Sequence, residues 1–226
     1  MKRYDRIVLN IPHATAHGIR EAHWDDREAV MAHVAYLTDW HTDWLFGRDD
    51  PRIEAVRASL SRFVVDCERL EDDPLEAVGQ GIIYTAFEGC KRTIDDRERA
   101  FLMGCYREHI GRLRTALTPD SILVDCHSFS SDKADVDICI GFNSDWSRPD
   151  DWTLQLVADT FKADGYTVAY NAPYSNSIAP VTGFPYPSVM IEVNKRCYMD
   201  EDTLLRHEGG DRLRQTISLT YKQLLR

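Results

Sequence analysis

Two histidines have the residue type and the positions expected of ligands in a hydrolytic metal site. His13 directly follows an apolar run at residues 6–11, and His127 follows another at residues 121–126. Imidazole is a common nitrogen ligand of zinc, and a catalytic zinc usually takes three protein ligands and keeps one open position. The long separation of the two histidines excludes a local zinc finger but allows two strand ends to meet in space. We therefore predict that His13 and His127 share one metal ion.

The third ligand is expected from the segment that follows the first histidine. Thr38-Asp39-Trp40-His41 offers a carboxylate and an imidazole, and Asp43 lies one helical turn beyond Asp39. Asp39 and Asp43 suit helix capping or a solvated helix face equally well. The residue types alone therefore leave Asp39, His41 and Asp43 open as the third ligand.

Glu192 is a second candidate for chemistry because it interrupts the apolar run at residues 188–193. Burying an unpaired carboxylate is expensive, so Glu192 must be paired or poised for a reaction. One interpretation is a general base that takes a proton from zinc-bound water. The other is a buried ion pair with Arg69 or Arg196.

Strands and helices alternate along the chain in the pattern of an α/β domain with a parallel or mixed sheet. Predicted strands cover residues 6–11, 63–67, 121–126, 136–142, 166–170 and 188–193. Predicted helices cover residues 24–44, 52–60, 95–117, 152–163 and 201–225. Residues 79–89 and 171–187 are the least regular segments. Because function in such sheets gathers where strands end, His13, His127 and Glu192 are expected to meet at one sheet edge.

The overall composition narrows the class of partner. The 226 residues carry 27 Lys and Arg against 37 Asp and Glu, a net charge of −10. This charge argues against nucleic acid and against an anionic membrane surface as partners. The first apolar run is too short for a signal peptide, and none approaches the roughly 20 residues of a membrane span. We predict one cytoplasmic domain over residues 1–226; the oligomeric state stays open.

Five short motifs occur in an order that resembles the N-formylglutamate amidohydrolase family. They are Pro12-His13, Thr38-Asp39-Trp40-His41, the segment from Ser61 to Asp66, Asp125-Cys126-His127-Ser128, and Ile191-Glu192 with Tyr198-Met199-Asp200-Glu201. The resemblance implies a three-layer α/β/α sandwich with a mixed sheet, similar to zinc-dependent exopeptidases. It also implies one catalytic zinc and hydrolysis of the amide bond of a small N-acyl amino acid such as N-formylglutamate.

The resemblance also assigns roles to individual residues. The implied zinc ligands are His13, Asp39 and His127, and Glu192 is the implied catalytic carboxylate. Arg62 is expected to stabilise the negative charge that forms on the reacting oxygen. Substrate binding is expected from Arg69, Asn171, Arg196 and Tyr198. Asp66 and Asp125 are candidates for orienting the histidines by accepting an imidazole N–H.

Two departures from the family pattern keep alternatives open. Glu68 stands where the family has Asn before its second arginine, and residues 171–177 lack the basic, glycine-rich character of the family loop. The alternatives are a carboxypeptidase-like enzyme, a hydrolase for another N-acyl amino acid, and a catalytically silent binding paralogue of the same fold.

Overall fold

Six strands form one central sheet in the computed structural model, which describes residues 3–20 and 22–226. In chain order they are β1 (Arg6–Ile11), β2 (Ile53–Arg57), β5 (Ser121–Phe129), β6 (Ile138–Gly141), β7 (Val168–Tyr170) and β8 (Ser188–Asn194). Their spatial order is β2-β1-β5-β8-β6-β7. Neighbouring strands run parallel except β8 and β6, which pair antiparallel. The predicted mixed sheet is confirmed.

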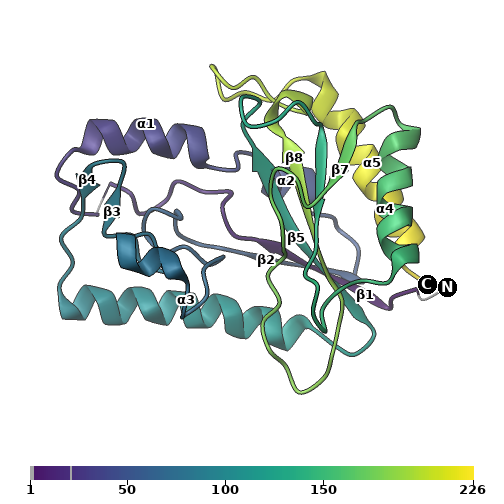
Figure 1. Ribbon diagram of the computed structural model, residues 1–226, viewed down its shortest axis with the longest axis horizontal. Helices are drawn as coiled ribbons and strands as arrows, with labels where there is room; N and C mark the ends of the chain where they lie inside the picture. The colour runs from purple at the N-terminus through teal and green to yellow at the C-terminus, as the bar shows by residue number, and fades with distance from the viewer. Residues whose placement is uncertain (1–2, 21) are drawn as a thin grey trace.

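Helices cover both faces of this sheet. They are α1 (Arg27–Leu37), α2 (Thr42–Phe46), α3 (Asp96–Ala116), α4 (Asp151–Ala163) and α5 (Glu208–Leu224). The helices α2, α4 and α5 share a core with one face, and α1 and α3 share a core with the other. In Figure 1, α4 and α5 lie side by side, whereas α1 and α3 reach away from the opposite side of the sheet. The chain therefore has the predicted three-layer α/β/α architecture.

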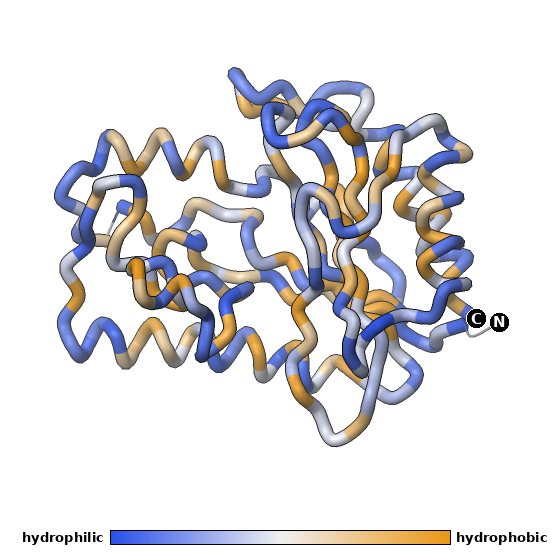
Figure 2. The backbone as a smooth tube through the Cα atoms, viewed as in Figure 1, coloured by the Kyte–Doolittle hydropathy of each residue, from blue (hydrophilic) through white to orange (hydrophobic). Residues whose placement is uncertain are grey.

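Short elements complete the fold. Two 3-10 turns, η1 (Pro74–Val78) and η2 (Lys195–Cys197), and a small hairpin of β3 (Ala86–Phe87) and β4 (Cys90–Lys91) lie between the main elements. The hairpin lies between α1 and α3 in the part of the molecule that reaches away from the sheet (Figure 1). Hydrophilic and hydrophobic residues alternate along α3 (Figure 2), as expected of a helix with one buried face.

The two faces of the sheet differ in chemistry, and this difference creates the site. In β5, Ile122, Val124 and Cys126 pack into the core shared with α4 and α5. The alternate residues face the other side, where Leu123 joins the core of α1 and α3 but Asp125 and His127 are polar. Successive side chains of a strand point to opposite faces, so one strand serves an apolar core and a polar site at once.

Two elements differ in type from the sequence prediction. Residues 52–60, predicted as a helix, contain the edge strand β2, which pairs in parallel with β1. Residues 63–67, predicted as a strand, form turns that begin at Ser61, whose carbonyl accepts hydrogen bonds from the N–H groups of Val64 and Val65. Their apolar side chains are buried against α1 and α3. A short apolar run of this kind fits a strand or a packed turn, and periodicity does not separate the two.

Two helices are shorter than predicted. The region 24–44 divides into α1 and α2, because Thr38 is extended and His41 has a left-handed backbone with φ of 66°. The region 201–225 becomes helical only from Glu208, where the His207 side chain accepts a hydrogen bond from the Gly209 N–H. Such side-chain caps fix where a helix begins. The break between α1 and α2 positions Asp39, a residue of the site described below.

Within residues 3–20 and 22–226, no helix combines the length and apolar character needed to cross a bilayer.

Candidate metal centre and its cavity

Three predicted ligands meet at the carboxyl end of the sheet. His13 lies just beyond β1, His127 lies near the end of β5, and Asp39 occupies the break between α1 and α2. The Asp39 N–H donates to the carbonyl oxygen of His13 at 3.0 Å, which ties the two loops together. All three residues are buried. His41 turns away and contacts the carbonyl of Leu204 instead.

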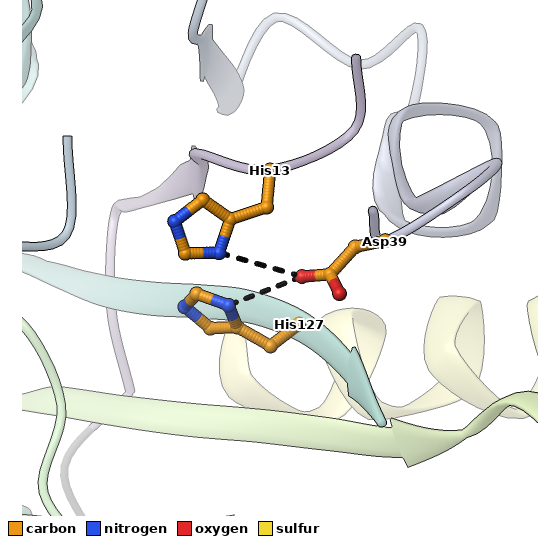
Figure 3. A group of neighbouring side chains, drawn as sticks. All are labelled: His13, Asp39 and His127. Carbon is orange, nitrogen blue, oxygen red and sulfur yellow. Dashed lines mark hydrogen bonds and ion pairs between the residues drawn. The ribbon is translucent and has the colours of Figure 1, made fainter. Parts of the chain in front are cut away.

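The two imidazoles present the same nitrogen to one carboxylate oxygen (Figure 3). Nδ1 of His127 lies 3.3 Å from Oδ2 of Asp39, and Nδ1 of His13 lies 3.7 Å from the same oxygen. Ligand atoms of all three residues lie within 4.8 Å of one another. Two ligands on a tetrahedral zinc are separated by roughly 3.3 Å, given bonds of about 2.0–2.1 Å. The donor set and its spacing therefore fit a single small cation such as zinc.

A further carboxylate holds the far nitrogen of each imidazole. Oδ1 of Asp66 lies 2.8 Å from Nε2 of His13, and Oδ1 of Asp125 lies 3.0 Å from Nε2 of His127. A carboxylate at this position accepts a hydrogen bond from the ring Nε2–H, and the Nδ1 lone pair is then free to bind a metal. Nδ1 of His13 is buried and has no hydrogen-bond partner among the described residues. This is also what we expect of a nitrogen that binds a cation. The structure thus shows both hydrogen bonds predicted for Asp66 and Asp125.

The charges around the cluster balance one another in the metal-free chain. Burial by itself raises the pKa of Asp39, but the nearby imidazoles of His127 and His13 hold it well below its usual range. Burial lowers the pKa of His127, yet the nearby carboxylates, Asp125 foremost, raise it well above its usual value. The carboxylates therefore favour a proton on His127, and binding of a cation at Nδ1 would require the loss of that proton.

Glu192 lies on the same face of the sheet as His127. The two residues are directly opposite each other in the parallel pair β5 and β8. Burial raises the pKa of Glu192 to about 8, with further contributions from Asp39 and Asp125. Its Oε2 is buried without a hydrogen-bond partner among the described residues. Neither ion pair considered from the sequence forms: Arg69 contacts Asp66 and Asp73, and Arg196 contacts Asp135 and Asp137.

These groups line one cavity of about 640 Å³. His13, Asp39, His127 and Glu192 lie in its wall together with Arg62 and Arg69. Nη2 of Arg62 lies 3.2 Å from Oδ2 of Asp66, and Nε of Arg69 lies 3.5 Å from the same oxygen. Asp66 therefore connects a histidine of the cluster to two cations of the cavity. Burial raises the pKa of Asp66, but the positive charge of its partners outweighs burial. The pKa of Asp66 therefore lies well below its usual range.

Glu68 also lies in the cavity wall, and its backbone N–H donates to Oδ1 of Asp66 at 3.0 Å. Its Oε2 is 3.3 Å from Nε2 of His127 and 3.3 Å from Nδ2 of Asn10. Burial and the carboxylate of Asp125 raise the pKa of Glu68 to about 8. The residue that departs from the family pattern is therefore part of the site's own hydrogen-bonded surroundings.

Three predicted substrate-binding residues are absent from the lining of the cavity. Tyr198 is fully buried and donates its hydroxyl to the Trp40 carbonyl. Arg196 lies on η2 with its guanidinium paired to Asp135 and Asp137. The side chain of Asn171 accepts a hydrogen bond from the Phe142 N–H in an exposed turn. Each is engaged elsewhere, so the structure does not bring them to the cluster.

The sequence analysis missed several residues of the site. Asn10 interrupts an apolar strand just as Glu192 does, and this signal could have identified it. Lys195 follows Glu192 by three residues, is 3% exposed, and donates to the carbonyl oxygen of Tyr36. Lys133 and Tyr174 also line the cavity. They come from loops, where no periodic pattern marks a functional position.

Comparison with known proteins identifies a family and a fold. The family described as N-formylglutamate amidohydrolase matches residues 5–199. The N-formylglutamate amidohydrolase of Ralstonia eutropha JMP134 is similar in structure with a TM-score of 0.79 and 20% identity, covering 99% of this chain and 94% of that chain. A gene product of Agrobacterium tumefaciens has a TM-score of 0.60 and 17% identity, covering 99% and 91%. At these identities the likeness establishes the fold. No curated protein sequence matches this chain.

Proposed function

Because the chain belongs to the N-formylglutamate amidohydrolase family, which supports an amide hydrolase, we propose that it is a zinc-dependent enzyme. In this proposal His13, Asp39 and His127 bind the zinc ion within one catalytic domain. The substrate is a small N-acyl amino acid such as N-formylglutamate, and the bond cleaved is its amide.

The observation that carries the proposal is the relation of Glu192 to the three ligands. Its carboxylate shares a cavity with them and keeps one oxygen buried without a partner. A buried carboxylate in this condition is costly unless it has a task. Its opposite neighbour in the sheet is His127, so Glu192 lies beside the cluster without being one of its three close members.

The chemistry divides between the metal and the residues around it. A bound zinc ion supplies Lewis-acid activation of water and of the amide carbonyl. Glu192 accepts a proton from the attacking water and delivers it to the amide nitrogen of the leaving amino acid. A raised pKa suits this exchange, because the carboxylate must take up the proton and then release it. Asp66 and Asp125 keep both imidazoles oriented throughout.

The two arginines provide the positive charge that an anionic substrate needs. Arg62 is assigned to the oxygen of the scissile carbonyl, where negative charge develops. Arg69 is assigned to the substrate carboxylate, which a guanidinium binds through two parallel hydrogen bonds. Their common contact with Asp66 fixes the two guanidinium groups relative to His13.

The test combines metal analysis with two substitutions. Purified protein should contain about one zinc per chain, and His127→Ala should lose it. Glu192→Gln should keep the metal and the fold but lose amide hydrolysis by a factor of about 100 or more, because general acid–base catalysis contributes about 10²–10⁴-fold. His41→Gln is the matched control, since His41 lies in the same break between α1 and α2 but contacts Leu204. It should leave the metal content unchanged.

Two results would contradict the proposal in different ways. Folded protein that takes up no zinc would exclude the metal site. Full activity in Glu192→Gln would exclude the assigned base while leaving the metal site intact.

The acyl amino acid itself is best tested with a panel of N-formyl, N-acetyl and dipeptide substrates. The panel should also contain substrates without a second carboxylate, because the carboxyl group of Glu68 lies in the cavity beside His127. At a pH above 8, where the Glu68 carboxyl group is ionised, Glu68→Gln should raise turnover of N-formylglutamate relative to a substrate with a neutral side chain. An unchanged ratio between the two would remove Glu68 from the determinants of specificity.

A further inference from the structure

A row of hydrogen-bonded, buried polar side chains runs from helix α3, along the sheet face that α3 covers, to the proposed metal cluster. Nε2 of His109 lies 2.7 Å from Oδ1 of Asn10, and Nδ2 of Asn10 donates to Oδ1 of Asp125 at 2.8 Å. The same Asp125 oxygen lies 3.0 Å from Nε2 of His127. Asn10 and Asp125 are fully buried, and His109 is 3% exposed. Three different elements, α3, β1 and β5, therefore meet through this row.

The chemistry of the neighbours fixes the direction of each hydrogen bond. The Nδ2 side of the Asn10 amide faces two carboxyl groups, those of Asp125 and Glu68. Only the NH₂ group can donate to both, so the amide oxygen must face His109. His109 must then donate from Nε2.

The surroundings of His109 favour a neutral ring. Burial, with a further contribution from Arg112, lowers the pKa of His109 to about 4. The imidazole is therefore uncharged at neutral pH, and Asn10 receives its hydrogen bond from a neutral donor.

We propose that Asn10 and His109 are positioning residues that hold Asp125, and through it the imidazole of His127, in the orientation that presents Nδ1 to the metal. With Asn10 donating, Asp125 is kept as an acceptor toward His127. Its other oxygen accepts from the Ile178 N–H at 3.0 Å, so the carboxylate is fixed from two sides. His109 in turn prevents the Asn10 amide from rotating its oxygen toward Asp125.

This role is separate from substrate binding and catalysis. Asn10 and His109 are not part of the cavity lining. The inference rests on the metal site of the proposed function, and its effect is expected in metal affinity before it appears in turnover.

The test measures zinc affinity by competition with a chelator in three variants. Asn10→Ala should weaken binding by about 10- to 100-fold, the range found when groups that support a metal ligand are removed. His109→Leu should weaken it by roughly threefold to tenfold, since it acts one hydrogen bond further away. His109→Gln should restore affinity close to the unaltered protein, because its side-chain amide places an N–H donor the same number of bonds from the backbone.

A matched control separates positioning from general destabilisation. Thr220→Val removes a fully buried hydroxyl on α5 that donates to the Thr216 carbonyl on the far face of the sheet. At a comparable loss of melting temperature, this variant should keep its zinc affinity.

A readout without metal keeps this inference distinct from the proposed function. In metal-free protein the ring N–H of His127 should give a slowly exchanging NMR signal that Asn10→Ala shifts or abolishes. If the unaltered protein took up no zinc, the proposed function would fail. The NMR signal would still show whether the hydrogen bonds from His109 through Asn10 and Asp125 hold His127. Unchanged zinc affinity in both Asn10→Ala and His109→Leu would overturn the proposal, as would failure of His109→Gln to restore a loss.

Discussion

The two histidines of the cluster are supported by the same chemical group in opposite surroundings. Asp66, behind His13, lies among donors that carry charge or face the cavity: Arg62, Arg69 and the Tyr84 hydroxyl. Asp125, behind His127, lies among buried neutral donors, the Asn10 amide and the Ile178 N–H. One carboxylate is thus connected to the substrate side of the site and the other to the interior of the fold.

This difference indicates a division of labour. A change at Asp66 is expected to reach both the metal and the residues that bind substrate, because the arginines share its Oδ2. A change at Asp125 is expected to reach the metal first and the cavity only through Glu68, whose pKa Asp125 raises. The two carboxylates are therefore expected to differ in function even though their contacts with the imidazoles are alike.

The largest expected effect comes from replacing each carboxylate by its amide. Asp66→Asn and Asp125→Asn should both weaken zinc binding by about 10- to 100-fold, because each replaces the charged acceptor of an imidazole N–H by a neutral amide. At saturating zinc, Asp66→Asn should also raise KM, whereas Asp125→Asn should change KM less, because both arginines contact Asp66. Chelator competition gives the affinities, and initial rates at saturating zinc give KM. Equal KM values in the two variants would contradict the division of labour.

A smaller effect is expected in the pH dependence of metal uptake. In the metal-free chain the pKa of His127 is raised by its carboxylate neighbours, so a bound metal displaces a proton. Zinc affinity should therefore rise with pH, by about tenfold per pH unit for each proton displaced, until the pH passes the pKa of His127.

Asp125→Asn provides the comparison for this prediction. It removes the largest favourable charge on His127, so the rise in affinity should end at a lower pH than in the unaltered protein. Chelator competition across a pH series measures both curves. Identical curves would show that Asp125 does not control the protonation of His127.

The smallest expected effect concerns the hydroxyl group behind Asp66. Tyr84→Phe removes a donor 3.1 Å from Oδ2 of Asp66 and should cost about 1 kcal/mol of unfolding free energy. It should weaken zinc binding only a few-fold, since both arginines remain. Tyr106→Phe is the control, because its hydroxyl donates to the Arg69 carbonyl rather than to a carboxylate. Denaturant unfolding and zinc competition would distinguish the two variants.

The sheet and the cluster were predictable from the sequence for related reasons. Near-continuous apolar runs predicted β1, β5 and β8. His13 and His127 were recognised as polar residues that follow two of these runs, and Glu192 because it interrupts the third. Residues 52–60 were wrongly predicted as a helix because an edge strand of five residues has too few buried positions to show its period.

The rest of the site depends on contacts that join distant parts of the chain. Asn10 and His109 lie 99 residues apart, and their pairing follows from packing α3 on the sheet. Tyr198 and Arg196 belong to the segment after Glu192, yet the turn of η2 directs one into the core and the other toward Asp135 and Asp137. For these two residues, proximity in sequence to Glu192 did not predict proximity in space.

The hydrogen bond from the Asp39 N–H to the His13 carbonyl has a consequence for the entropy of metal capture. It closes the long loop that contains α1. The conformational entropy lost in bringing His13 and Asp39 together is therefore lost when the chain folds, before any metal binds. In zinc fingers that cost is met only when the metal arrives, and the metal-free chain is unfolded. Here the ligands are arranged in advance, and we expect a chelator to remove the ion while the protein stays folded.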